Sequence, residues 1–151
     1  MIGVIQRVTS ASVSVAEEVV ARIGPGLLVL VGVTHSDTGD DAGALGSKIA
    51  ALRVFADDSG LMNRSVAETG GEVLVVSQFT LLGDARKGRR PSFVEAAAPV
   101  IAAPLIEEVK RAIARQGVSV STGVFGAHMK VELVNDGPVT LIVRTEAGRI
   151  V

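Results

Sequence analysis

Apolar and polar residues alternate along the first part of the chain, over residues 2–8 and again over 11–15. Such alternation is typical of strands that bury one face and expose the other. After a Gly-Pro-Gly turn at 24–26, the continuous apolar run 27–33 predicts a strand that is buried on both faces. The N-terminal part of the chain is therefore predicted to be a β-sheet.

Two later stretches repeat their apolar residues at helical spacing. The first covers residues 45–52 and follows a polar loop over 34–41 that offers several residues able to cap a helix. The second covers residues 101–113, and Gly117 stands where a helix-ending glycine is expected. Both stretches are predicted to be helices that pack one face on the core.

The remaining apolar segments have the character of strands, namely residues 53–56, 72–82, 118–120, 130–134 and 139–144. The order is strands, helix, strands, helix, strands, which differs from a regular βαβ repeat and predicts an α+β fold. With no internal repeat and no linker, residues 1–151 have the size of one domain.

Composition limits the chemistry that this domain can carry. The chain has no cysteine, and its two histidines, His35 and His128, cannot by themselves complete a metal site. Nucleotide-binding glycine motifs, the Gly-x-Ser-x-Gly elbow and the His-Glu-x-x-His pair are all missing. We expect no cofactor and no metal, so an enzyme built on this chain would rely on backbone groups and hydroxyls.

Charge and hydropathy suggest where the protein acts. The net charge is −1, so any contact with nucleic acid must come from a local basic patch. The N-terminus lacks the features of a signal peptide, and the longest apolar run is too short to span a bilayer core of about 30 Å. A soluble cytoplasmic protein with no membrane partner is expected.

One candidate site is Ser77–Leu81, where the strongest predicted strand abruptly becomes polar. From the pattern alone, hydroxyls that tie down loop amides at a strand end are the favoured interpretation. The alternative is functional: the hydroxyls of Ser77 and Thr80, with free backbone N–H groups, could bind a carbonyl oxygen.

A second candidate site is Asn135–Thr140. Asp-Gly is a common hairpin signal, and the pattern alone favours a hairpin between the strands at 130–134 and 139–144. Pro138 is unusual there, because it removes an N–H where the returning strand should pair. The turn is therefore expected to project instead of closing tightly.

Four segments together resemble the D-aminoacyl-tRNA deacylases of the D-tyrosyl-tRNA deacylase type. They are Gln6–Val8, Ser77–Leu81, Arg90–Phe93 and Asn135–Thr140, in the order and spacing of that family. The resemblance runs from Met1 to about Val143. It implies a homodimer with a curled, barrel-like mixed sheet backed by helices, and no metal.

The resemblance also implies a substrate. Members of the family hydrolyse the ester between a D-amino acid and the 3′ end of tRNA, and glycine mischarged onto alanine tRNA is typically accepted too. The partners implied are thus D-aminoacyl-tRNA, glycyl-tRNA and a second copy of the chain, with no DNA. Two alternatives remain: an editing enzyme of the same fold that removes L-alanine, and a tRNA-binding module without activity.

By the same resemblance, the residues that surround the scissile carbonyl are Ser77, Gln78, Phe79 and Thr80. Thr80 has no base near it in sequence, so attack by water, assisted by the ribose 2′-hydroxyl, is preferred over attack by Thr80. Phe125 and Met129 would line the pocket for the terminal adenosine.

By the same resemblance, Gly137–Pro138 would form a cis peptide inserted into the partner subunit's site, and its backbone would read chirality. The carbonyls of Gly137 and Pro138 would hold the substrate's α-amino group and leave no room for an L side chain, while Arg7 braces the loop.

The basic segment that follows the polar strand end contains Lys87, Arg89 and Arg90. They are expected either to be solvated surface or to contact tRNA phosphates. Two features depart from the family pattern. His128 stands where many members carry Asp, and residues 145–151 extend past the usual end, where we expect a frayed extension.

Overall fold

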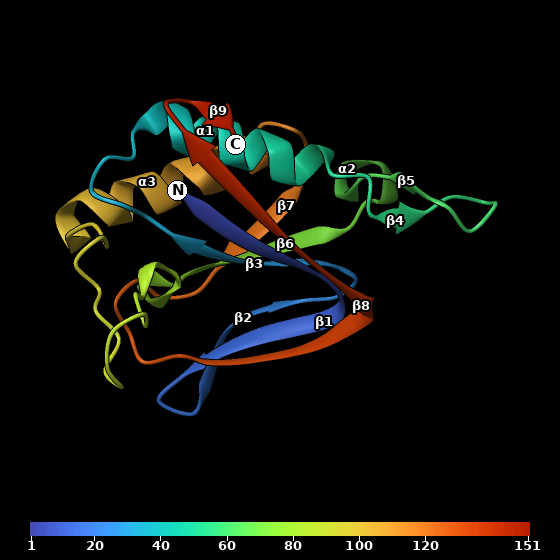
Figure 1. Cartoon of the computed structure of the whole chain (residues 1–151). Coiled ribbons are helices and arrows are strands. Elements are labelled where there is room, and N and C mark those ends of the chain that lie inside the picture. Colours follow the sequence, from blue (N-terminus) through green and yellow to red (C-terminus); the bar gives the residue numbers. More distant parts are fainter.

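The computed structural model describes residues 1–151 and contains one large mixed sheet (Figure 1). The strands of this sheet are β1 (Ile2–Val15), β2 (Glu18–Ile23), β3 (Gly26–Gly32), β6 (Glu72–Ser77), β7 (Ser119–Thr122), β8 (Lys130–Glu146) and β9 (Arg149–Ile150). Their order is β7-β6-β3-β1-β8-β9, and β2 pairs with β1. β3, β6 and β7 run parallel, whereas the pairs made by β1 and β8 are antiparallel.

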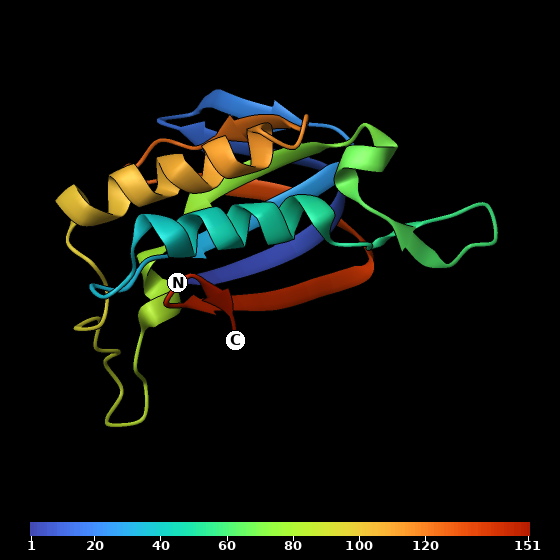
Figure 2. The same cartoon turned by 90° about the horizontal axis from the view of Figure 1, so that it is seen from above.

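The helices lie together on one face of this sheet, as the view from above shows (Figure 2). They are α1 (Gly39–Ala51) and α3 (Pro99–Ala114), with the short α2 (Val66–Thr69) and the 3₁₀-helix η1 (Phe79–Leu82) at the edges. A small arm made of β4 (Phe55–Ala56) and β5 (Met62–Arg64) projects from the body. The predicted α+β fold with a curled sheet backed by helices is confirmed. None of the helices combines the length and the hydrophobicity that a membrane-spanning helix needs.

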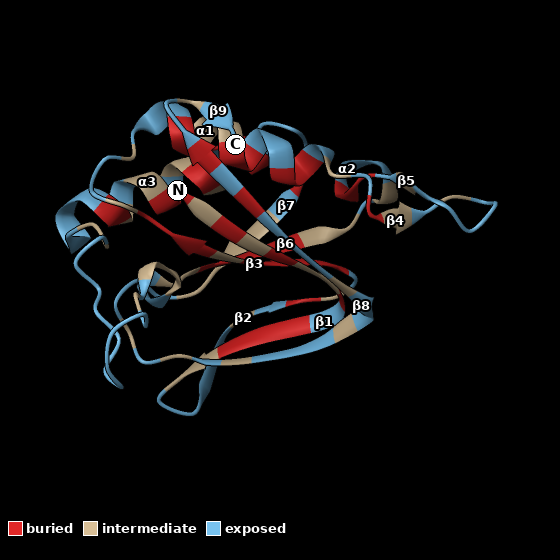
Figure 3. Ribbon diagram, viewed as in Figure 1, coloured by how far each residue is buried: buried red, intermediate tan, exposed pale blue.

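The curl of the sheet creates two cores. A cluster of 20 buried residues lies between the helices and the sheet. A second cluster of 7 lies inside the curl, where the far halves of β1 and β8 bend under β3 and β6 (Figure 3). Strand β3 separates the two clusters, with Leu27, Val29 and Val31 facing one and Leu28 facing the other. This position explains why the run 27–33 is apolar at nearly every residue.

The helices are fixed by local chemistry that the sequence carries. Thr38 and Asp41 form a capping box at the start of α1, and the Asp41 carboxylate also accepts the Gly148 N–H at 2.9 Å. Gly46 allows α1 to approach α3, because a Cβ there would lie 2.5 Å from the Ala112 Cβ. Gly117 has a φ of +80° just after α3, as expected for a helix-ending glycine.

The prediction of a frayed C-terminal tail is wrong. Residues 145–151 complete β8 and return as β9, and Thr145 is fully buried. The Met1 ammonium donates to the Thr145 carbonyl at 2.8 Å, and the Thr145 N–H donates to the Met1 carbonyl at 3.0 Å. The tail is thus paired with the start of the chain, a long-range contact that no local pattern could reveal.

Two strand predictions also need correction. The segments 130–134 and 139–144 are parts of one strand, β8, and do not form a hairpin. Both run along β1, which pairs with them from Ser14 to Ile2. The segment 72–82 is a strand only as far as Ser77, because Leu81 and Leu82 belong to η1.

Candidate active site

The first candidate segment is a tight turn at the end of the buried strand β6. Residues 73–76 of β6 are buried, and the last ladder bond is donated by the Gln78 N–H to the Val31 carbonyl at 2.8 Å. The chain then turns into η1, and we call residues 77–82 the polar turn. Gly32 makes room for this turn, because a Cβ there would lie 2.5 Å from Leu82 Cδ2.

The polar turn presents backbone donors that have no partner. The N–H groups of Leu81 and Gly83 donate to the Gln78 and Thr80 carbonyls, but those of Phe79 and Thr80, the first two residues of η1, have no acceptor within this 3₁₀-helix and no side-chain cap. The side-chain amide of Gln78 donates to the Thr80 hydroxyl, and this amide is the only hydrogen-bond partner of the hydroxyl within the protein. An amide does not act as a base, so the Thr80 oxygen remains a neutral hydroxyl that can still donate its proton.

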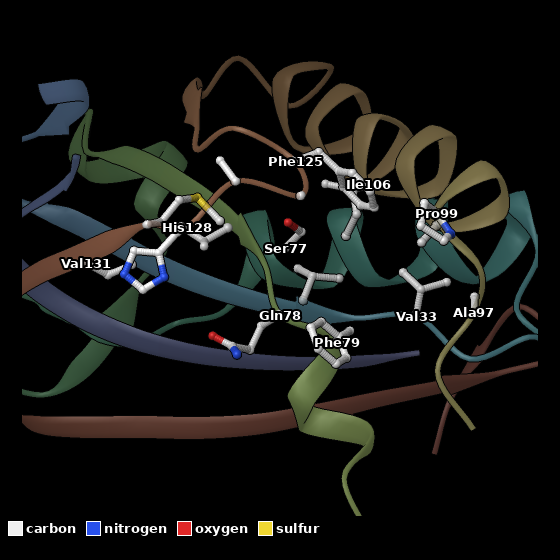
Figure 4. A pocket seen from close by; sticks show the side chains of 16 residues that line it. Val33, Ser77, Gln78, Phe79, Ala97, Pro99, Ile106, Phe125, His128 and Val131 are labelled. Atoms are coloured by element: carbon white, nitrogen blue, oxygen red, sulfur yellow. The ribbon is translucent and has the colours of Figure 1, made fainter. Parts of the chain in front are cut away.

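A cavity of about 370 Å³ opens beside this turn (Figure 4). Its lining is mostly apolar and consists of Val31, Val33, Val76, Ser77, Gln78, Phe79, Ala97, Pro99, Ala102, Ile106, Phe125, Gly126, Ala127, His128, Met129 and Val131. Phe125 and Ile106 lie on one side, Gln78 and Phe79 on the other, with Ser77 between them. The volume suits a small organic ligand.

The cavity therefore joins residues that the sequence indicated separately. Ser77, Gln78 and Phe79 share it with Phe125 and Met129, although nearly 50 residues separate the two groups. Thr80 is not among the lining residues. His128 is the one ionisable side chain in the lining.

The second candidate segment interrupts β8 and projects from it. Asn135 pairs with Val8 and Thr140 with Gln6, so residues 136–139 stand opposite Arg7 alone. We call residues 135–140 the Gly137 loop. Asp136, Gly137 and Pro138 are exposed, and the Gly137–Pro138 peptide bond is cis, as predicted.

The side chain of Asn135 closes this loop. Its Oδ1 accepts the Val139 N–H at 2.8 Å, and its Nδ2 donates to the Val139 carbonyl at 3.1 Å. The amide thereby satisfies the backbone groups of Val139, which the bulge removes from the ladder. Asn is favoured at this position because its side chain carries both a donor and an acceptor.

Arg7 braces the loop from below. Its Nε donates to the Asp136 carbonyl at 2.9 Å, and its Nη1 donates to the buried Val54 carbonyl at 2.6 Å. The Arg7 side chain is only 15% exposed. The Gly137 loop is therefore tied to the base of the β4–β5 arm, a contact that the sequence did not suggest because a carbonyl acceptor leaves no trace in it.

The Gly137 loop and the polar turn lie at opposite ends of the sheet within the chain. The loop flanks Val8, which pairs with Gly26, whereas Ser77 pairs with Val31. Five residues of strand separate these levels, or roughly 16 Å at about 3.3 Å per residue. No loop residue lines the cavity. The fold of the single chain does not bring the two candidate segments together.

The basic segment carries its charges on the surface. Lys87, Arg89 and Arg90 are exposed and make no ion pair within the chain. Arg86 differs, because its Nε and Nη2 donate to the Asp84 carboxylate at 2.8 and 2.7 Å. These hydrogen bonds lower the pKa of Asp84 to about 2. Three cations thus remain for a ligand.

Free donors and a hydroxyl at the mouth of an apolar cavity define a site suited to acyl-group chemistry. Residues 4–144 match the family model described as D-Tyr-tRNA(Tyr) deacylase. Two similar proteins, both named D-aminoacyl-tRNA deacylase, come from Thermus aquaticus and Geobacillus sp. (strain WCH70). They are 59% and 58% identical over 143 residues, which is 95% of this chain and 94% of each relative. The chain belongs to the D-Tyr-tRNA(Tyr) deacylase family.

Two solved structures are similar to this chain in fold. The chain is similar to a structure titled "c-Myc DNA Unwinding Element Binding Protein", with a TM-score of 0.89 and 38% identity, covering 97% of this chain and 100% of that one. It also shares its fold with a probable eukaryotic D-amino acid tRNA deacylase at a TM-score of 0.80 and 18% identity, over 93% and 97% of the two chains. The family resemblance found in the sequence is confirmed.

Proposed function

We propose that this protein hydrolyses the ester bond of D-aminoacyl-tRNA, releases free tRNA and the D-amino acid, and rejects L-aminoacyl-tRNA. The observation that carries the proposal is the pair of unpartnered N–H groups of Phe79 and Thr80 beside the apolar cavity, in a chain of this family. Hydrolysis of an aminoacyl ester develops negative charge on the carbonyl oxygen. Donors aimed at that charge lower the barrier by roughly 3–4 kcal/mol each.

The terminal adenosine would occupy the cavity, with its base between Phe125 and Met129. This places the esterified ribose near Ser77 and the scissile carbonyl at the polar turn. Water attacks the carbonyl carbon, the ester C–O bond breaks, and the ribose oxygen takes the proton. Water is preferred over Thr80 as the nucleophile, because the Thr80 hydroxyl contacts an amide and no base. The ribose 2′-hydroxyl lies next to the ester and assists the attacking water.

A second copy of the chain would complete the site. Along residues 130–144, β8 is paired on one side only, and its exposed side chains include Leu133, Val134, Leu141 and Ile142. An open strand edge with apolar side chains is normally covered. In a homodimer the Gly137 loop of one subunit can enter the cavity of its partner. It cannot reach the cavity of its own subunit, because it lies too far from it.

The chiral filter would then be the backbone of Gly137 and Pro138, braced by Arg7. Two carbonyl oxygens accept from the substrate's α-ammonium group, and the main chain occupies the space that an L side chain needs. Glycine has no side chain to exclude, so glycine mischarged onto alanine tRNA is also a substrate. Lys87, Arg89 and Arg90 hold the acceptor-stem phosphates. The protein would act in the cytoplasm, where aminoacyl-tRNA is formed.

One experiment separates the candidate functions. Alanine tRNA carrying D-alanine, L-alanine or glycine is incubated with the protein, and release of the amino acid is followed. The proposal predicts rapid release of D-alanine and glycine and retention of L-alanine. Rapid release of L-alanine would favour an editing enzyme for that amino acid, and no release with tight binding would favour a tRNA-binding module. Sedimentation of the free protein, predicted to give a dimer, tests the shared site.

A further inference from the structure

The segment between the polar turn and α3 is a closed loop with anchored ends. The N–H groups of Asp84 and Ser92 donate to each other's carbonyl groups at 2.7 and 2.9 Å. Further along, the Ala97 N–H donates to the Val33 carbonyl at 2.9 Å, which fixes the segment to the end of β3. The basic residues therefore lie at the tip of a loop whose base adjoins the candidate site, away from the sheet (Figure 2).

An aromatic pair joins the base of this loop to the polar turn. The rings of Phe93 and Phe79 pack edge to face, with centroids 5.2 Å apart and planes at 73°. Gly83 makes room for Phe93, because a Cβ there would lie 2.9 Å from Phe93 Cε1. Phe79 is 58% exposed and Phe93 37% exposed, so this mutual contact is a main restraint on both rings.

The residue restrained by this pair supplies one of the free donors. Phe79 carries an unpartnered N–H and precedes Thr80, which carries the other. η1 spans only Phe79–Leu82 and has few internal hydrogen bonds to hold its direction. Its orientation therefore depends on packing, with Gly32 on one side and Phe93 on the other.

We propose that Phe93 is a positioning residue: it holds the Phe79 ring, and through it orients the N–H groups of the polar turn toward the scissile carbonyl. This inference rests on the proposed deacylase function. Phe93 affects the rate of the chemical step and not the affinity for RNA. That affinity is provided by the basic side chains at the loop tip. Because the Asp84–Ser92 pair closes the loop, the tip and the polar turn remain one unit when tRNA binds.

The test compares kcat and KM on two substrates, D-tyrosyl-tRNA and the 3′-ester of D-tyrosine with adenosine, which lacks the acceptor-stem phosphates. Phe93→Leu keeps an apolar side chain but removes the ring, and should lower kcat by about 10- to 100-fold on both substrates. KM for tRNA and its salt dependence should stay at the wild-type values. Phe93→Tyr keeps the ring and should restore kcat.

Gly83→Ala provides a second perturbation that keeps the Phe93 side chain but crowds its ring, with the added Cβ also 3.0 Å from the Thr80 carbonyl oxygen. The added methyl group displaces the ring and should also lower kcat, whereas the thermal unfolding midpoint should stay near that of the wild type. Two controls should leave kcat unchanged: Val94→Ala, because Val94 is 78% exposed, and Gly43→Ala, because a Cβ there meets nothing within 4 Å.

The proposal is overturned if Phe93→Leu and Gly83→Ala keep the wild-type kcat on the adenosine ester. It is equally overturned if their loss appears only as a higher KM for tRNA, because Phe93 would then serve RNA binding. A wild-type protein that hydrolyses neither substrate would overturn the proposed function itself. The wild-type protein thus tests the function, whereas the variants test the role of Phe93.

Discussion

Replacing Gly137 with alanine is the most informative single change, because this residue would approach the substrate most closely. Its φ is +145°, in the region that side chains rarely adopt. An added Cβ would lie 2.8 Å from the Val139 nitrogen and 3.2 Å from Arg7 Nη2. The backbone of the Gly137 loop must therefore shift to accept even a methyl group.

The size of the effect can be bounded from this geometry. Positive-φ strain costs about 1–3 kcal/mol. The loop is exposed and stays anchored by Asn135, so the protein should remain folded. A displacement near 1 Å at a reacting centre costs roughly 100-fold in rate. We expect kcat/KM for a D-ester of tRNA to fall by about that factor, while the free energy of unfolding falls by only about 1–3 kcal/mol.

The matched control is Gly60→Ala. Gly60 also has a positive φ, +80°, but lies at the tip of the β4–β5 arm, where a Cβ meets nothing within 4 Å. Urea unfolding and deacylation are measured on both variants. The control should lose about 1–2 kcal/mol of stability and keep its activity.

Wild-type activity in the Gly137→Ala variant would refute the reasoning, because the loop would then lie away from the substrate. An equal loss of activity in both variants would also refute it, since strain at a remote turn would then account for the effect.

Three further predictions concern other parts of the molecule. Thr80→Ala should keep most of the deacylation rate, and an acyl-enzyme adduct in the mass spectrum of the wild type would instead identify Thr80 as the nucleophile. Arg7→Leu should lower the free energy of unfolding by about 1.5–3 kcal/mol in urea titrations, because the buried Val54 carbonyl loses a charge-assisted partner; an unchanged value would show that water replaces the guanidinium. Burial alone would raise the pKa of Asp41, but hydrogen bonds from Gly148 and Thr38 lower it. The ionised Asp41 carboxylate therefore stabilises the fold at pH values above the pKa of an unfolded-chain aspartate, and this stabilisation is lost as the pH falls through the lowered pKa. Asp41→Asn should therefore flatten the acid limb of stability against pH, and an unaltered limb would contradict this.

The sequence was sufficient to predict the helices and strands whose local pattern agrees with their burial. The β3 run and the apolar stripes of α1 and α3 are set by the two cores, and the positions of β3 and α3 were predicted to within a few residues. α1 begins at Gly39, six residues before the predicted stripe, because its first turn is polar and capped by Thr38 and Asp41. The exposed strand β2 (Glu18–Ile23) was not predicted, because five of its six residues lie outside the core and it depends on pairing with β1.

The sequence was insufficient where a distant partner decides the structure. Asp136-Gly137 is a local hairpin signal, yet β1 continues past it and holds both flanking segments in one strand. Likewise, the apolar Leu81 and Leu82 suggest a longer strand, but they turn inward because Gly32 leaves space for them. Register and packing between remote segments are tertiary properties that periodicity does not encode.

In the candidate site, too, local motifs reveal some residues and only tertiary contacts reveal the others. Ser77, Gln78 and Phe79 belong to one of the four short motifs, whereas Phe125 and Met129 followed from the family resemblance. The structure gathers all five around one cavity. What the motifs could not reveal is which groups hold the site in shape. The Val54 carbonyl beneath Arg7 and the ring of Phe93 against Phe79 emerge only from the folded chain.

The most direct test of the central claim is the ratio of deacylation rate constants for the D and L forms of one amino acid on one tRNA. It is measured for a small side chain, alanine, and a large one, tyrosine. A backbone filter does not contact the D side chain, so both amino acids should give a strong and similar preference for the D form. A ratio near one, or a preference for D that appears with only one of the two amino acids, would contradict chiral selection by the Gly137 loop.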